Sequence, residues 1–78
     1  MNYSEIFIRV IKIISLKTQI LEVELESNTR ISDLGIDSLD LMELEMEIEE
    51  EFNIPLNITD SIPDDINDIV YQIQKKLQ

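Results

Sequence analysis

Apolar residues recur at helical spacing in three stretches of the chain. Those of the first stretch, residues 3–16, are Ile6, Phe7, Val10, Ile11 and Ile14. Spacings of three and four positions predict an amphipathic helix. Asn2 and Glu5 have the spacing of a capping pair, so we expect this helix to begin directly after Asn2.

A second predicted helix follows Asp37, which has the position of an N-cap with Asp40 three residues later. Pro55 limits its other end, because the residue before a proline avoids the helical conformation. Two apolar rows lie side by side along this helix, one of Leu41, Leu44, Ile48 and Phe52 and one of Leu39, Met42 and Met46.

The third stretch predicts a last helix that begins at about Ile62. Ser61 and Asp64 have capping spacing, and Pro63 falls in the first turn, where its missing N–H matters least. Residues 56–61 hold at most one short turn before it. The expected inner face of the last helix consists of Ile66, Ile69, Val70, Ile73 and Leu77.

Between the first two helices the pattern changes to an alternation of apolar residues with glutamates, which is the period of a strand. A lone strand has no partner in so short a chain, so we expect an extended loop instead. Loops of this length are usually functional or disordered. The residues expected to pin the loop to the core are Ile20, Val23, Leu25, Ile31 and Leu34.

A chain of 78 residues is long enough for one small domain, here residues 1–78. The expected fold class is all-α: a small bundle of three main helices plus one short helix, with a long loop between the first two main helices.

Composition removes many kinds of chemistry. The chain has no histidine and no cysteine, so disulfides, thiolate metal sites and imidazole bases are excluded, and we expect neither an enzyme nor a metal site. A net charge of −11 repels nucleic acids and anionic membranes and favours basic protein partners. No apolar run reaches the ~20 residues of a membrane span, and we expect a cytoplasmic monomer.

The second predicted helix carries charge that opposes its own stability. Glu43, Glu47 and Glu51 are spaced by four, and each like-charged pair costs roughly 0.2–0.5 kcal/mol in an isolated helix. Residues 49–51 add three carboxylates at the C-terminal end, where the helix dipole disfavours anions. A solvated face is the simpler interpretation. Because an apolar row runs beside these acids, the pattern favours docking onto basic, partly apolar partners.

Residues 33–40, Asp-Leu-Gly-Ile-Asp-Ser-Leu-Asp, form the most informative local string. Ser38 falls in the first turn of the second helix, where free N–H groups favour a phosphate, although a plain helix cap explains the same pattern. A hydrolase that uses Ser38 as nucleophile would need an activating base, which the sequence does not offer nearby. A calcium loop fails as well, because its third position would be Gly35 and its twelfth Leu44.

This string, followed by Glu43-Leu44 and by Glu49-Glu50-Glu51-Phe52, resembles the acyl carrier proteins over nearly the whole chain. The resemblance implies a four-helix bundle that works as a carrier. It also implies that a separate magnesium-dependent phosphopantetheinyl transferase attaches 4′-phosphopantetheine from coenzyme A to Ser38. The terminal thiol of that arm would hold acyl groups as thioesters.

The resemblance assigns roles to further residues. Acyl-transferring and acyl-modifying enzymes with basic docking patches would be met by Asp37, Leu39, Asp40, Met42, Glu43, Met46, Glu49 and Glu50. An acyl cavity, or simply the core, would be lined by Leu44, Ile48 and Phe52.

Two residues depart from the fatty-acid type of carrier: Glu45 and Glu47 stand where a small or branched apolar residue is expected. They would narrow or polarise the acyl cavity or change the choice of partner. A carrier dedicated to polyketide, peptide, lipid or surface-polymer synthesis is therefore as open as one for fatty acids. The alternative from another class is an acidic interaction adaptor of carrier-like fold that is not modified.

Overall fold

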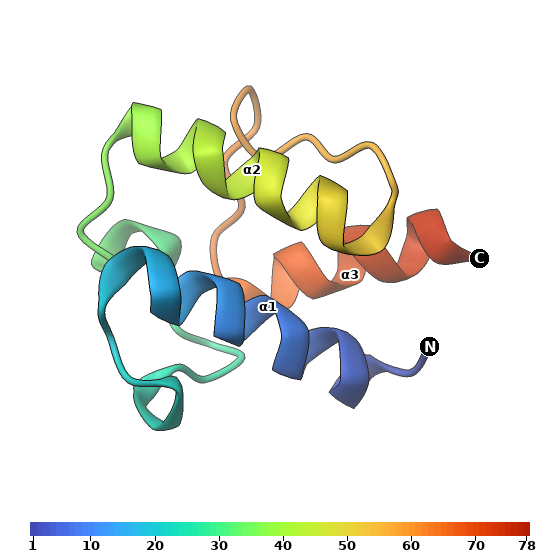
Figure 1. Cartoon of the computed structure of the whole chain (residues 1–78), viewed down its shortest axis with the longest axis horizontal. Helices are drawn as coiled ribbons and strands as arrows, with labels where there is room; N and C mark the ends of the chain where they lie inside the picture. Colours follow the sequence, from blue (N-terminus) through green and yellow to red (C-terminus); the bar gives the residue numbers. More distant parts are fainter.

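Three α-helices and no β-strand make up the chain, and the computed structural model describes all 78 residues. The helices are α1 (Tyr3–Thr18), α2 (Ser38–Phe52) and α3 (Ile66–Leu77). α1 packs against both α2 and α3, and it runs antiparallel to α2 in Figure 1. The all-helical fold class predicted from the sequence is confirmed.

α1 and α2 begin where their capping residues predict. The Asn2 side chain accepts a hydrogen bond from the Glu5 backbone N–H at 2.9 Å, and Asp37 accepts one from Asp40 at 2.8 Å. Each bond satisfies a backbone donor that has no partner within its helix. α2 ends at Phe52, and Asn53 follows in a left-handed conformation that closes the helix.

The core lies where the three helices meet and is entirely apolar. Ile6, Ile14, Leu44, Ile48 and Ile69 are fully buried in it, and no polar or charged side chain is buried with them. Burying one such side chain stabilises the fold by about 1.5–3 kcal/mol. The predicted rows on α1 and α2 therefore form the core as expected. Leu77, predicted on the inner face of the last helix, lies at the exposed end of α3.

The loop between α1 and α2 is anchored, but not by every apolar residue predicted to do so. Leu25, Ile31 and Leu34 are buried, and Ile20 packs against the core. Val23 is 85% exposed, so its predicted anchoring role is wrong. The reason is local: residues Glu22–Glu24 form a turn of 3₁₀-helix, which breaks the alternation of an extended chain.

The last helix begins four residues later than the capping pattern at Ser61 predicts. Asp65 is the N-cap of α3, and its side chain accepts a hydrogen bond from Asp68 N–H at 2.9 Å. The preceding residues are held extended against the first loop, since Ile31 N–H donates to the Asp64 carbonyl at 3.0 Å and Ile66 N–H to that of Thr29 at 3.1 Å. These backbone bonds stabilise the extended conformation of the residues before Ile66, so the helix begins only at Ile66.

The segment between α2 and α3, residues 53–65, contains no helix, so the short helix expected there is absent. Two α2 carboxylates hold the segment instead. Glu49 accepts a hydrogen bond from Leu56 N–H at 2.8 Å. Glu45 accepts from Ile58 N–H at 3.1 Å, from Thr59 N–H at 2.9 Å and from the Thr59 hydroxyl. Glu45 therefore faces this segment rather than the interior of the bundle.

Aromatic residues also join α1 to α3. The Tyr3 ring meets the Tyr71 ring edge-on at 6.3 Å, and the Tyr3 hydroxyl donates to the Asn67 side chain. Burial raises the pKa of Tyr3, and the nearby Tyr71 and Asp65 raise it further.

The helices of this fold lack the combination of length and apolar character that a membrane-spanning helix needs.

Candidate functional site

Ser38 is the first residue of α2, and its side chain is exposed. Asp37 caps the helix and its carbonyl accepts the first helical bond, from Leu41 N–H at 3.0 Å. The N–H groups of Ser38 and Leu39 have no acceptor within the helix, because they lie in its first turn. Together with the positive end of the helix dipole, they favour an anion bound at Ser38.

The loop before Ser38 is fixed by its own residues. Ile31 begins a short 3₁₀ turn, Ile31–Asp33, and Leu34 follows it; both side chains are buried and so tie the loop to the core. Gly35 then turns the chain with a φ of +72°, a conformation that side-chain-bearing residues adopt at a cost. A Cβ at this position would meet nothing within 4 Å, so the backbone angle alone favours glycine.

Ser38 borders a groove of about 360 Å³, at the small end of the range for small-molecule sites. The apolar residues that line the groove include Ile36, Leu41 and Ile62. Its polar lining includes Arg30 and Thr59. Because Glu45 holds Thr59 in place, the α2 carboxylate also fixes one wall of this groove.

Most of this groove was not predictable from spacing in the sequence. Ile36 adjoins Ser38 in the informative string, but Thr59 and Ile62 come from the segment before α3. That segment reaches Ser38 through the bonds to Glu45 and to the first loop, which no local pattern reports. Ser38 itself makes no side-chain hydrogen bond that would activate it as a nucleophile.

The residues predicted to recognise partners fall into two groups in the structure. Leu39, Met42 and Met46 are 62%, 49% and 60% exposed, and the side chains of Glu43 and Glu50 are exposed on the same helix. We call these five residues the α2 strip. The carboxylates of Asp37 and Glu49 already accept hydrogen bonds from the N–H groups of Asp40 and Leu56, whereas the carboxylate of Asp40 has no hydrogen-bond partner and is partly exposed.

The residues predicted for an acyl cavity lie in the closed core. Leu44 and Ile48 are fully buried and Phe52 is 6% exposed. The groove beside Ser38 is lined by none of these three residues. Apart from Ser38, the residue of α2 that lines it is Leu41.

Ion pairs between α1 and α2 partly neutralise the acidic face. Lys17 Nζ lies 3.1 Å from Glu43 Oε1 and 3.5 Å from Glu47 Oε1, and Arg9 lies 3.2 Å from Glu51. The hydrogen bond to Glu43 raises the pKa of Lys17; Glu47 also raises it, whereas desolvation opposes the change. The ion-pair contribution of Lys17 is therefore complete at neutral pH and is lost as the pH rises through this raised pKa.

Salt should stabilise this protein. α2 contains three like-charged pairs at i,i+4, which together cost about 1 kcal/mol, and surface ion pairs return little. Raising NaCl from about 0.01 M to about 1 M shortens the Debye length from about 30 Å to about 3 Å. We expect the Tm, followed by circular dichroism, to rise by about 4–8 °C. A fall in Tm would mean that the ion pairs of Lys17 and Arg9 outweigh the repulsion.

The structure is that of a small helical domain with an exposed serine at a helix N-terminus. A comparison with family models matches residues 9–62 to the family described as the phosphopantetheine attachment site. The chain belongs to this family, whose members carry 4′-phosphopantetheine covalently. A comparison with curated proteins finds no match.

Proposed function

We propose that Ser38 is the attachment site and that the chain is an acyl carrier protein, which delivers acyl intermediates to enzymes of fatty-acid, polyketide or related biosynthesis. The observation that carries this proposal is the position of Ser38. It is exposed, it opens α2, and it lies within the residues that match the family. The charge and the exposed face of α2 support a role in protein docking.

The chain's own residues suit the attachment. The Ser38 hydroxyl is accessible to a transferase, and the N–H groups at the start of α2 stabilise a phosphodiester anion at its oxygen. When bound, 4′-phosphopantetheine supplies a terminal thiol on which acyl groups are held as thioesters. Because the chain has no cysteine, it offers no second thiol to which an acyl group would migrate.

The bound acyl group has two places to go: the groove beside Ser38 and the core of the bundle. A short acyl group and part of the arm fit the groove of about 360 Å³ beside Ser38. A long acyl chain enters the core only if the packing around Leu44, Ile48 and Phe52 opens. Glu45 restrains such opening, because its carboxylate holds Ile58 and Thr59 against α2. We therefore propose that this carrier favours short cargo.

Partner enzymes, including the phosphopantetheinyl transferase, would dock on the α2 strip. Replacing Glu43 with glutamine should lower the kcat/KM of modification about five- to tenfold, because it removes a half-exposed charge that guides a basic partner and that the ion pair with Lys17 only partly neutralises. Glu24→Gln is the matched control, since Glu24 is exposed in the first loop, and it should change little. Equal rates for both variants would contradict docking on the α2 strip. Glu49 is unsuitable for this test because its carboxylate holds Leu56.

Carriage itself is tested by loading. The chain is incubated with a broad-specificity phosphopantetheinyl transferase, magnesium and acetyl-coenzyme A, and its intact mass is measured. We expect a gain of one acetylated arm, from which hydroxylamine removes only the acetyl group. An unmodified adaptor would show no gain on the folded chain, which would contradict the proposal.

A further inference from the structure

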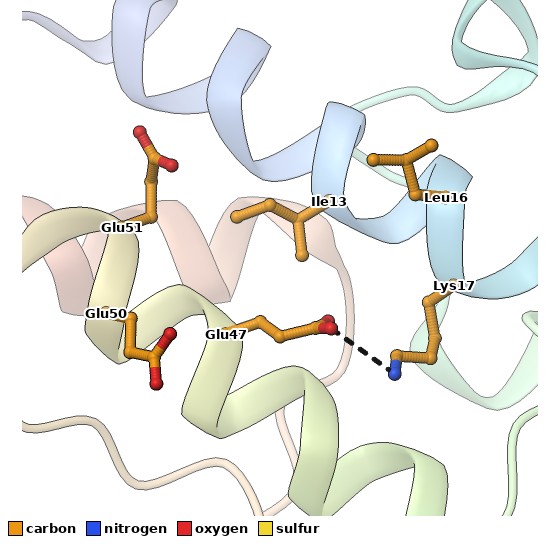
Figure 2. Close-up of a pocket in the computed structure, with 6 residues that line it drawn as sticks. All are labelled: Ile13, Leu16, Lys17, Glu47, Glu50 and Glu51. Atoms are coloured by element: carbon orange, nitrogen blue, oxygen red, sulfur yellow. Dashed lines mark ion pairs between the residues drawn. The ribbon is translucent and has the colours of Figure 1, made fainter.

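A second groove lies between α1 and the C-terminal half of α2, and it shares no residue with the groove beside Ser38. Its volume is about 490 Å³. In Figure 2, Ile13 projects from α1 toward α2, Leu16 lies one turn further along α1, and the glutamates come from α2. The residues that line it are Ile13, Leu16, Lys17, Glu47, Glu50 and Glu51.

The α1 side of this groove exposes an apolar surface that the fold does not use. Leu16 is 73% exposed, and Ile13 beside it is only partly buried against the core. Covering an exposed leucine removes apolar surface from water, so a partner that covers Leu16 gains affinity. One exposed leucine is unremarkable, but one that forms the wall of a groove offers a defined contact.

The α2 side supplies an acidic rim with one carboxylate left over. Lys17 pairs with Glu47 at 3.5 Å, and Arg9 pairs with Glu51 at 3.2 Å. Glu50 lines the same groove, is exposed, and has no ion pair. Since α2 has no basic residue between Ser38 and Phe52, nothing on this helix neutralises it.

We propose that this groove binds a basic segment of a partner protein, with an aliphatic side chain against Leu16 and Ile13 and a cationic side chain beside Glu50. A second copy of the chain does not fit, because both copies carry a net charge of −11. An anionic lipid surface is excluded for the same reason. The groove extends the docking surface from α2 onto α1, and it does not depend on modification of Ser38.

The test uses a synthetic amphipathic peptide of leucine and arginine as probe, titrated into the ¹⁵N-labelled chain and followed by NMR. We expect saturable shifts at the amides of Ile13, Leu16 and Glu50. Leu16→Ser should weaken binding at least fivefold, whereas Leu21→Ser, at a residue that is also exposed but lies outside the groove, should not. Both side chains lie largely in solvent, so both variants should fold.

A second pair of variants separates the groove from general charge attraction. Glu50→Gln should weaken binding of the peptide more than Glu24→Gln does, although each substitution removes one negative charge. The Ser38→Ala chain should bind the peptide as the unaltered chain does. Shifts confined to Leu39, Met42 and Met46, or equal affinities of the Leu16 and Leu21 variants, would overturn the proposal while leaving the carrier function intact.

Discussion

Replacing Ser38 with alanine should abolish attachment of 4′-phosphopantetheine completely, while the free energy of unfolding changes by less than about 0.5 kcal/mol. The loss is complete because the phosphodiester needs the serine oxygen and no neighbouring group replaces it. The fold is unaffected because Asp37, not Ser38, caps α2 and the Ser38 side chain is exposed. The two quantities are measured by intact mass and by thermal unfolding.

Ser32→Ala is the matched control for that result. Ser32 is exposed and lines the same groove as Ser38, but it lies in the 3₁₀ turn before α2 rather than at the helix N-terminus. This variant should be modified as readily as the unaltered chain. Modification of the Ser38→Ala chain, or its loss in the Ser32→Ala chain, would contradict the assignment of the site.

Removal of the Glu45 carboxylate should be the most damaging change to an acidic residue. Glu45→Ala leaves Ile58 N–H, Thr59 N–H and the Thr59 hydroxyl without a charged acceptor. Hydrogen bonds to charged groups contribute about 1.5–3 kcal/mol each, and water replaces part of this at a half-buried site. We expect a total loss of about 2 kcal/mol, which for a domain of this size lowers the Tm by about 8–16 °C.

Two further variants show whether this loss comes from the hydrogen bonds of Glu45. Glu45→Gln keeps one acceptor oxygen and should lie between the alanine variant and the unaltered chain. Glu50→Ala removes from the same helix a carboxylate that has no hydrogen bond or ion pair, and it should change stability by less than about 0.5 kcal/mol. Amide hydrogen exchange at Ile58 and Thr59 should quicken in the Glu45 variants alone. Equal Tm values for the Glu45 and Glu50 variants would show that Glu45 does not hold the segment.

Local rules predicted the helices well where one strong signal stands alone. Asn2 and Asp37 cap α1 and α2 as their spacing to Glu5 and Asp40 indicates. The start of α3 was missed because the spacing at Ser61 predicts one start, whereas the structure caps the helix at Asp65. Long-range backbone bonds from Ile31 and Ile66 decide between them. No local pattern contains that information.

The site, like the helices, was predictable only where a local pattern in the sequence reports it. The string around Ser38 predicts the serine and its place in the first turn of a helix, and the structure has Ser38 as the first residue of α2. The roles of individual glutamates on α2 were not predictable, because spacing alone does not distinguish them. Glu45 and Glu49 hold the segment before α3, Glu43 and Glu47 meet Lys17, and Glu50 faces a groove.

The central claim is that Ser38, among the six serines of the chain, carries the prosthetic group. The most direct measurement is intact mass after incubation with a phosphopantetheinyl transferase, magnesium and coenzyme A, followed by fragmentation that locates the added mass. We expect a single added phosphopantetheine, on Ser38. An adduct on another serine, or no adduct on the folded chain, would contradict it.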